Sequence, residues 1–529
     1  MSNAYESAAA LRPHHLEPTD LRQLVRSFSL VPAPGTSQED VDGVMVTGVS
    51  VDSGDVAPGE LFVGLPGFKV HGASFAAQAV GAGAVAVVTD SQGAHLAADL
   101  PGTPVLVHED PRALVGPLSQ EVYHHPAEHL TATAVTGTNG KTTTSYFLDA
   151  MLAAHLGGCM VAGTVELRVG GTSVESPRTT VEAPVLARMM ALAVEEGVGA
   201  ASLEASSHAI VLHRLDGVIF DVVGFTNLQR DHLDFHKTME GYLEAKSRLF
   251  TPDHARSAVV CVDDRWGASL ARTASAAGLE VERVRAYPGD AECDWWVSDA
   301  AVSLAEAATT FTLHGPGAQE ISASCPLPGL VNVQNAALAL VMAIRAGVPA
   351  PTAVAALAGA HNIPGRMQRV SQRDGTRGLC IVDFAHTPDA MELALEAVRP
   401  ITPGRLIVVF GSDGDRDQGK RPMLGEVAAR LADVLVVTDE NPRSEDPQTI
   451  RDAVLAGVRR VRPDLADVEE VTTWRGDAVR RGVELCGPDD TVIVTGKGHE
   501  PFLEVADQFI RYNDAPVMRE AVEAKWGQA

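Results

Sequence analysis

The chain of 529 residues lacks the features that mark secreted, membrane-spanning and zinc-ribbon proteins. It has six cysteines, and no two of them form a Cys-x-x-Cys pair, which argues against a zinc ribbon and against a disulfide framework. Its first residues contain no apolar segment of signal-peptide length. No later run reaches the roughly 18 apolar residues that a membrane helix needs. We therefore expect a soluble protein of the reducing cytoplasm, without membrane insertion.

Positive charge is scarce as well. The chain has 42 Lys and Arg residues against 68 Asp and Glu residues, which gives a formal net charge of −26. A field of that sign repels nucleic acid, so we expect no nucleic-acid partner. Any phosphate-bearing ligand must then be bound by local cations, backbone amides or metal ions.

Three consecutive segments alternate between strand-like and helix-like patterns, which indicates an α/β protein of several domains. Residues 1–127 contain short apolar runs between Ala- and Gly-rich helical stretches and predict an N-terminal α/β domain. Residues 128–363 begin with the strand-like sequence TATAV before a Gly-rich loop and predict a central nucleotide-binding domain. Their later part, 294–326, alternates polar and apolar residues, as antiparallel strands do. Residues 364–529 predict a C-terminal domain.

The C-terminal domain repeats an apolar strand, a polar loop and usually a helix. The predicted strands are 380–384, 406–410, 434–438 and 491–495. This alternation is typical of a Rossmann-like, doubly wound parallel sheet. Ligands of such sheets bind outside the carboxyl ends of the strands. Because all four following loops are rich in polar and charged residues, we expect a binding face at this edge.

The segment TGTNGKTT, residues 136–143, has the character of a phosphate-binding P-loop. It joins a predicted strand to a helix that starts near Lys141, so backbone N–H groups and a helix N-terminus face one point. Lys141 would neutralise phosphate charge, and the hydroxyl of Thr142 is suited to Mg²⁺. Val135 stands where the common P-loop has glycine. The expected ATP-binding residues of the loop are Gly137, Thr138, Asn139, Gly140, Lys141, Thr142 and Thr143. A kinase, a GTPase and a ligase all remain open on this evidence.

Lys246 lies on an apolar helix face. In the predicted helix 241–250, Leu243, Lys246 and Phe250 are spaced by three and four residues, so they share one side. A lysine there either extends its ammonium back to solvent along a buried stem or serves a buried site.

The P-loop sequence GTNGKTT resembles that of the Mur ligase family and its folylpolyglutamate synthetase relatives. Further segments match the same family: EASSH (204–208), FTNLQRDHLDFH (225–236), GSDGDRDQGKRP (411–422) and TGKGHE (495–500). The resemblance extends over about residues 45 to 515. It implies three domains, with a P-loop ATPase domain in the centre and a Rossmann-like domain at the C-terminus.

The activity that the resemblance implies is ATP-dependent amide formation. A γ-carboxylate of UDP-N-acetylmuramoyl-L-alanyl-D-glutamate would be phosphorylated to an acyl phosphate, and the amine of a third amino acid would displace the phosphate. This reaction belongs to peptidoglycan precursor synthesis, and so to cell-wall biogenesis, cell shape and cell division. ATP and Mg²⁺ are the implied cofactors, and a monomer is expected. A folylpolyglutamate-type ligase is the more distant alternative.

The resemblance also assigns roles around the nucleotide. Catalytic roles fall to Lys141, Lys246 and His208. Metal ligation falls to Thr142, Glu204, His232 and Lys246, the last as a carbamate. Burial favours carbamate formation because desolvation lowers the pKa of a lysine and frees the amine that attacks CO₂. Further ATP contacts are expected at Asn332, Arg366 and Asp383.

Two further groups of residues would bind the other substrates. The UDP-muramoyl-peptide contacts implied by the resemblance are Val51, Ser53, Lys69, Val70, His71, Thr179, Thr180, Ser206 and Arg214. Leu212 stands where the family has a glutamine. The amino-acid contacts are Arg416, Glu440, Asn441, Arg443, Gly496 and Glu500. Glu440 replaces the aspartate of the family's DNPR motif for diaminopimelate, whose distal carboxylate Arg443 would grip bidentately. Diaminopimelate is the expected amino acid, and L-lysine or ornithine is the alternative.

Overall fold

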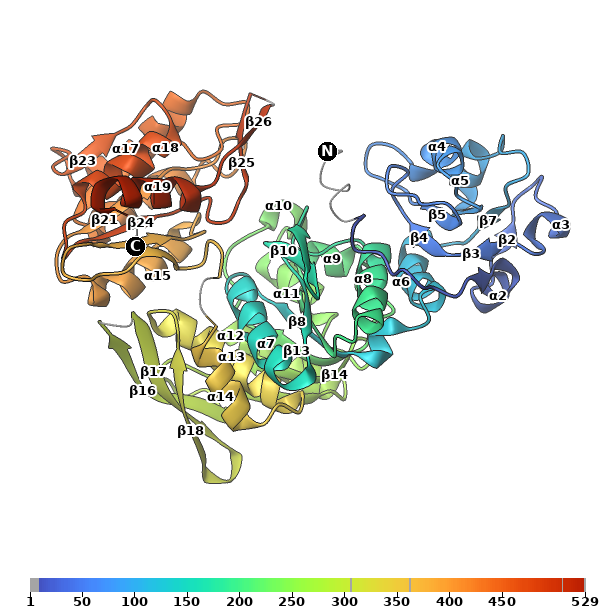
Figure 1. Ribbon diagram of the computed structural model, residues 1–529, viewed down its shortest axis with the longest axis horizontal. Coiled ribbons are helices and arrows are strands. Elements are labelled where there is room, and N and C mark those ends of the chain that lie inside the picture. Colours follow the sequence, from blue (N-terminus) through green and yellow to red (C-terminus); the bar gives the residue numbers. More distant parts are fainter. Residues whose placement is uncertain (1–8, 305–306, 361–362, 507, 528–529) are drawn as a thin grey trace. The chain divides into compact units, whose positions relative to one another are not determined.

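The computed structural model describes residues 9–304, 307–360, 363–506 and 508–527. The chain forms two compact units. The first contains residues 1–296, 315–317 and 335–356, and the second contains residues 297–314, 318–334 and 357–529. Figure 1 shows the elements of both along the chain. None of the described helices is both long and apolar enough to cross a lipid bilayer.

A small sheet forms the N-terminal part of the first unit, as predicted. Its strand order is β2-β7-β6-β5-β4, with β2 antiparallel to β7 and the other pairs parallel. The bounds are β2 Val31–Pro32, β4 Gly48–Ser50, β5 Glu60–Gly64, β6 Ala86–Thr89 and β7 Val105–Val107. Helices α2 (Leu21–Ser27) and α6 (Pro111–Val122) supply apolar side chains to the same core cluster as β5 and β6.

The second sheet of the first unit carries the P-loop. The order of its strands in this unit is β11-β10-β9-β12-β8-β13-β14-β15, and the pairs from β9 to β15 are parallel. The bounds are β8 Thr131–Thr136, β9 Cys159–Ala162, β10 Glu166–Val169, β11 Thr172–Glu175, β12 Ala200–Glu204, β13 Phe220–Phe225, β14 Ala255–Cys261 and β15 Glu280–Arg285. The central strands are almost entirely buried because helices pack on the sheet. These helices include α7 Lys141–Leu156, α8 Ala183–Glu195, α11 Met239–Ser247 and α12 Arg265–Ala276.

A buried ion pair connects the small sheet to helix α8. Arg188 of α8 donates from Nη1 to Oδ2 of Asp55 at 2.7 Å, and the two side chains are 1% and 5% exposed. Nη2 of Arg12 lies 3.1 Å from Oδ1 of the same aspartate. Charges removed from water this completely persist only when they are paired. The pair therefore fixes where α8 lies against the N-terminal part of its unit.

The second unit contains the predicted parallel sheet. Its order is β19-β20-β24-β21-β22-β23, in which β19 is antiparallel to β20 and the remaining pairs are parallel. The bounds are β19 Gln368–Ser371, β20 Leu379–Val382, β21 Leu406–Phe410, β22 Val434–Val437, β23 Val468–Glu470 and β24 Thr491–Val494. The four predicted strands are confirmed as β20, β21, β22 and β24. The connecting helices are α15 Pro388–Val398, α16 Lys420–Leu431, α17 Pro447–Val461, α18 Arg475–Leu485 and α19 Asp514–Trp526.

Several elements follow or extend these sheets. Strands β16 (Trp295–Ser303), β17 (Ala308–Gly315) and β18 (Gln319–Cys325) lie where the sequence predicts antiparallel strands, and helix α13 (Leu330–Arg345) follows them. A hairpin of β25 (Phe502–Val505) and β26 (Gln508–Arg511), which the sequence did not predict, follows the loop after β24. It becomes important at the candidate amino-acid site.

Candidate functional site

The phosphate-binding loop has the predicted strand–loop–helix geometry. Strand β8 ends at Thr136 and helix α7 begins at Lys141. Gly137 and Gly140 have φ angles of +145° and +89°, a backbone region that favours glycine. A Cβ at Gly140 would also collide with the side chain of Asn335. The loop thus needs glycine for its shape.

Hydrogen bonds to residues that follow strand β13 hold the loop in place. Thr138 N–H donates to the carbonyl of Asn227 at 2.9 Å, and Asn139 N–H donates to its side-chain Oδ1 at 3.1 Å. The hydroxyl of Thr226 donates to the carbonyl of Asn139 at 2.6 Å. Lys141 curls over the loop, because its Nζ donates to the carbonyls of Gly137 and Thr138 at 3.1 and 2.9 Å. The cation therefore lies over the loop that is predicted to bind phosphate.

Glu204, at the end of strand β12, is the centre of the site. Its carboxylate is 1% exposed. One oxygen accepts from the hydroxyl of Thr142 at 3.0 Å and from the hydroxyl of Thr164 at 2.9 Å, and the other accepts from Thr164 N–H at 2.8 Å. A buried carboxylate next to the P-loop threonine is a donor set that suits Mg²⁺, which prefers oxygen ligands. Thr142 and Glu204 of the predicted metal ligands are thus brought together.

Residues predicted to contact the muramoyl peptide adjoin the same carboxylate. Thr180 donates from its hydroxyl to the carbonyl of Glu204 at 2.7 Å, and it accepts from Ser206 N–H at 3.0 Å. Thr179 lies 3.2 Å from the hydroxyl of Thr164. Arg214 donates to the carbonyl of Thr180 at 3.1 Å. Of these four predicted peptide contacts, Thr180 touches Glu204 directly, and the other three touch Thr180 or Thr164.

Lys246 is buried against the underside of the P-loop. Its side chain is 1% exposed, and Nζ donates to the carbonyl of Gly137 at 2.8 Å and to the hydroxyl of Thr136 at 3.3 Å. The ammonium also lies 4.6 Å from the centre of the Tyr242 ring. Burial, and secondly the positive charge of Lys141, hold the pKa of Lys246 well below its usual range. The ammonium is therefore buried and does not extend back to solvent, whereas its role stays a prediction. Helix α11 ends at Ser247, so the predicted helix to residue 250 was too long.

Two histidines of the predicted site are neighbours. The rings of His208 and His232 have centroids 4.9 Å apart in an edge-to-face arrangement. Burial lowers the pKa of His232; the charge of Asp231 opposes this shift, and the charge of His208 adds to it. A neutral imidazole is the form that ligates metals. Within the part of the chain that the structure describes, no group of three or more His, Cys, Asp and Glu side chains converges on one point. The metal ligands predicted from the sequence also include Thr142 and Lys246, which are not among these residue types.

The predicted uridine contacts lie in the N-terminal part of the unit. Lys69 and Val70 are exposed, whereas His71 is partly buried and its Nε2 lies 3.1 Å from Oδ1 of Asp90. Val51 and Ser53 are partly exposed and follow strand β4. The described contacts do not join these five residues to the peptide contacts around Glu204, so their role stays a prediction.

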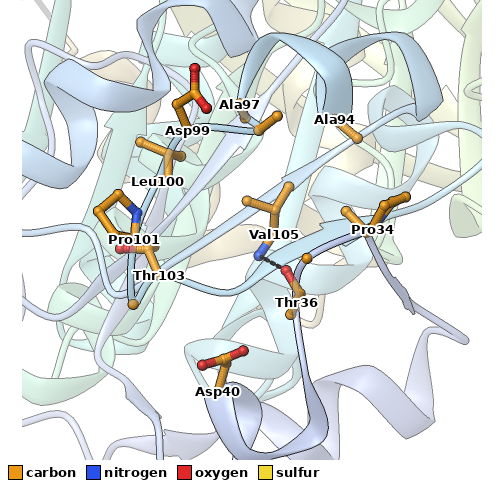
Figure 2. A pocket seen from close by; sticks show the side chains of 14 residues that line it. Pro34, Thr36, Asp40, Ala94, Ala97, Asp99, Leu100, Pro101, Thr103 and Val105 are labelled. Carbon is orange, nitrogen blue, oxygen red and sulfur yellow. Dashed lines mark hydrogen bonds between the residues drawn. The ribbon is translucent and has the colours of Figure 1, made fainter.

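A cavity of about 380 Å³ occurs elsewhere in the same sheet region, between the segment after β2 and the segment after α5 (Ser91–Leu96). Figure 2 shows its lining, which includes the carboxylates of Asp40 and Asp99. The lining contains no lysine, arginine or histidine. Two acids without a cation do not suit a diphosphate, and the cavity shares no residue with the predicted uridine contacts.

The remaining predicted ATP contacts belong to the second unit. Asn332 donates to the carbonyl of Pro328 at 2.8 Å. The guanidinium of Arg366 lies 4.4 Å from the ring centre of Phe384. Asp383 is buried and accepts from the backbone N–H groups of Met367 and Ala385 at 2.8 and 2.9 Å. Burial raises the pKa of Asp383. Their part in ATP binding stays a prediction.

Unsatisfied polar atoms mark the carboxyl edge of the parallel sheet in the second unit. Three adjacent strands, β24, β21 and β22, end there. Five buried side-chain oxygens at this edge have no hydrogen-bond partner among the described residues: Ser412 Oγ, Asp413 Oδ1, Thr438 Oγ1, Glu440 Oε2 and Thr495 Oγ1. Buried polar groups are normally satisfied, so a cluster of this kind indicates a ligand site. It lies at the edge that the sequence predicts as the binding face.

The predicted amino-acid contacts line this edge. Asn441 donates to Glu500 Oε2 at 3.1 Å and accepts from the buried Lys497 at 2.9 Å. A Cβ on Gly496 would lie 2.7 Å from Oε2 of Glu440, so glycine leaves room beside that carboxylate. Burial, and secondly the charge of Asp413, raise the pKa of Glu440 to about 8. Four predicted contacts are thus close together: Glu440, Asn441, Gly496 and Glu500.

Arg443 and Arg416 differ in their surroundings. Arg443 is largely buried and donates from Nε to Oε2 of Glu504 at 2.9 Å. Arg416 is exposed in the loop after β21, and its contact with a substrate stays a prediction. Sequence reasoning missed Asp413, Lys497 and Glu504. The first two lie inside matched family segments, whereas Glu504 lies on the unpredicted hairpin and had no signal.

Comparison with known proteins places these features in one family. Residues 45–121 match the Mur ligase family catalytic domain, residues 135–343 the Mur ligase middle domain, and residues 365–498 the Mur ligase glutamate ligase domain. The chain is 44% identical over 527 residues to the UDP-N-acetylmuramyl-tripeptide synthetase of Leifsonia xyli subsp. xyli, covering 98% of this chain and 99% of that protein.

Two further similar proteins have diaminopimelate in their names. The chain is 41% identical over 516 residues to the UDP-N-acetylmuramoyl-L-alanyl-D-glutamate–2,6-diaminopimelate ligase of Streptomyces avermitilis, covering 98% of this chain and 99% of that protein. A solved structure of a ligase with the same name is 31% identical, with a TM-score of 0.65, and covers 91% of this chain and 95% of that one.

Proposed function

The chain belongs to the Mur ligase family, and from that premise we propose that it adds the third amino acid to UDP-N-acetylmuramoyl-L-alanyl-D-glutamate. ATP is the energy source, and ADP and phosphate are the other products. The amino acid is 2,6-diaminopimelate, as in the name of the Streptomyces relative.

One observation supports this proposal most strongly. The carboxylate of Glu204 accepts a hydrogen bond from Thr142 of the P-loop, while its backbone carbonyl accepts one from Thr180 of the proposed peptide site. A nucleotide phosphate and a peptide carboxylate bound by these two threonines would meet at one buried residue. Phosphoryl transfer needs such positioning more than it needs covalent participation by the protein.

The chemistry then has two steps. An oxygen of the D-glutamyl γ-carboxylate attacks the γ-phosphorus of ATP, the bond to the β-phosphate oxygen breaks, and ADP leaves. The amine of the third amino acid attacks the resulting acyl phosphate, loses a proton and expels phosphate. Lys141 holds positive charge over the loop during the first step, when two anions must approach each other.

Magnesium is the metal that the oxygen ligands around Glu204 suit. Thr142 and Glu204 would hold it, and it would offset phosphate charge. We further propose that Lys246 is carbamylated and that His232 faces the same metal site. Support for the carbamate comes from the burial of Lys246 and from its lowered pKa, because the neutral amine is the form that attacks CO₂.

A phosphate-release assay tests the proposed function. Purified protein, ATP, Mg²⁺ and UDP-N-acetylmuramoyl-L-alanyl-D-glutamate are incubated with diaminopimelate, and the product is identified by its mass. We expect phosphate release that requires both the nucleotide peptide and the amine. Release with folate and glutamate in their place would instead favour a folylpolyglutamate-type ligase.

The same reaction with L-lysine or ornithine is a second candidate, and one contact favours it. The guanidinium of Arg443, which is predicted to bind the distal carboxylate of diaminopimelate, already donates a hydrogen bond to Glu504. A cytoplasmic location, a monomeric state and the absence of a nucleic-acid partner stay predictions from the sequence.

A further inference from the structure

Arg443 contacts carboxylates of its own chain on two sides. Its Nε donates to Oε2 of Glu504 at 2.9 Å, and its Nη1 donates to the carbonyl of Gly414 at 2.7 Å. Its Nη2 lies 3.6 Å from Oδ2 of Asp413. These acids raise the pKa of Arg443 although burial opposes them. A ligand carboxylate that approaches Arg443 therefore meets two negative charges that are already there.

The backbone fixes Glu504 in this place. Arg443 N–H donates to the carbonyl of Glu504 at 2.9 Å, and Ala506 N–H donates to the carbonyl of Arg443 at 2.8 Å, so strand β25 pairs with Arg443 as a parallel bridge through Val505. Glu504 N–H also donates to Oδ1 of Asn441 at 3.2 Å. The side chain of Glu504 is 32% exposed, which leaves it accessible to a competing ligand.

The neighbouring acids favour a cation. Oε2 of Glu440 and Oδ1 of Asp413 are buried and accept no hydrogen bond from the described residues. Gly496 leaves space beside Glu440. A side-chain ammonium entering this space would gain these two oxygens as hydrogen-bond acceptors.

We propose that Glu504 is a specificity-determining residue, an internal anion that competes with the distal carboxylate of the incoming amino acid for Arg443. A diamino acid with a second carboxylate must displace Glu504 and lie near Asp413. A diamino acid that ends in an ammonium alone leaves the Glu504–Arg443 pair intact. Glu504 thereby lowers the preference for a second carboxylate relative to the same site without this charge.

This inference rests on the proposed function, and its test is a ratio of two activities. The value of kcat/KM is measured by phosphate release for diaminopimelate and for L-lysine, with the UDP-linked dipeptide and ATP in excess. The variants are Glu504→Gln, which keeps the shape and removes the charge, and Glu504→Ser, which removes the charge with less bulk. Glu396→Gln, at an exposed position of helix α15, is the matched control.

We expect the diaminopimelate-to-lysine ratio to rise about tenfold in both Glu504 variants, as for the loss of one like charge in a partly screened site, and to stay unchanged in the control. A rise below about threefold, a fall, or loss of both activities in folded Glu504 variants would overturn the inference, because Glu504 would then serve only to hold Arg443. Failure of the proposed function looks different. In that case the unaltered protein releases no phosphate with any diamino acid.

Discussion

At the scale of single residues, the burial of Lys246 decides what its ammonium can do. A lysine enclosed beneath a phosphate-binding loop and close to Lys141 is destabilised as a cation. The ammonium first loses a proton, and the neutral amine then forms a bond between Nζ and the carbon of CO₂ and releases a second proton, so that the cation becomes an anion. That anion would suit a site that gathers Lys141 and metal ions.

Replacing Lys246 by methionine, which keeps an unbranched side chain, should lower phosphate release by about 10²–10³-fold, the usual effect of losing one preorganised charged group in an active site. The measurement is kcat for phosphate release together with a ¹³C NMR spectrum in ¹³C-bicarbonate. A carbamate signal should be present in the unaltered protein and absent in Lys246→Met. The same change at Lys525, in helix α19, whose Nζ donates to the carbonyls of Val483, Glu484 and Cys486, should leave the carbamate signal unchanged. A carbamate signal that survives in Lys246→Met would contradict the assignment.

Glu440 makes the stability of the second unit depend on pH. Its pKa is about 8, well above the ordinary value, because it is buried and faces Asp413 and Glu500, which the cations of Lys420 and Arg475 offset only in part. A raised carboxyl pKa means that the folded state holds the proton more tightly than the unfolded state does. The stability that this proton brings is complete below the ordinary range and is lost as the pH rises through about 8.

Glu440→Gln removes this dependence, because the amide stays neutral. Between about pH 5 and pH 8.5, the melting temperature of the unaltered protein should fall by a few degrees relative to that of Glu440→Gln, and not relative to that of Glu396→Gln. Thermal unfolding at several pH values measures the difference. Parallel curves for the unaltered protein and Glu440→Gln would show that Glu440 is ionised in the folded state.

At the scale of elements, the position of helix α8 depends on a buried charge. Arg188→Met leaves Asp55 in the interior with Arg12 as its remaining ion-pair partner in the described contacts. Removing one partner of a buried pair costs about 3–5 kcal/mol, and the contact with Arg12 places the expected loss near 3 kcal/mol. Urea unfolding measures it. Arg22→Met, at an exposed pair with Asp20, should cost less than about 1 kcal/mol. Equal losses would mean that the Arg188 pair contributes no more than a surface contact.

The same scale shows what sequence patterns reveal about this chain. The parallel strands are apolar runs that end in polar loops, and β20, β21, β22 and β24 were predicted for that reason. The hairpin of β25 and β26 was missed because its exposed faces carry Phe509 and Ile510, so no alternation of polar and apolar residues marks it. Glu504 was missed with it, since only pairing of β25 with Arg443 brings that carboxylate to the site.

The site residues differ in the same way: some lie in contiguous sequence motifs, and others come together only in the folded chain. The P-loop and Glu204 were found because their chemistry is encoded in contiguous motifs. The unsatisfied oxygens of Ser412, Thr438 and Thr495 carry no individual signal, since serine and threonine end many strands. Their common position becomes visible only when the strand order brings three carboxyl ends to one edge.

At the scale of the whole molecule, the residues predicted to bind ATP are divided between the two compact units. Lys141 and Glu204 belong to the first unit, whereas Arg366 and Asp383 belong to the second. The predicted amino-acid contacts also lie in the second unit, and the predicted peptide contacts lie in the first. Because an amine bound by one unit must reach an acyl phosphate bound by the other, we predict that the units close when all substrates are bound.

Small-angle X-ray scattering measures this closure. The radius of gyration should fall when a non-hydrolysable ATP analogue, Mg²⁺, the UDP-linked dipeptide and the diamino acid are all present, towards the roughly 24 Å expected of a compact chain of this length. No single ligand should produce the full decrease, because the dipeptide and the diamino acid each bind mainly to one unit and ATP alone leaves both of their sites empty. Lys141→Met should abolish the decrease by removing the cation over the phosphate loop, while Lys525→Met should preserve it. Equal radii with and without the full set of ligands would contradict closure, and the two halves of the ATP site would then need another explanation.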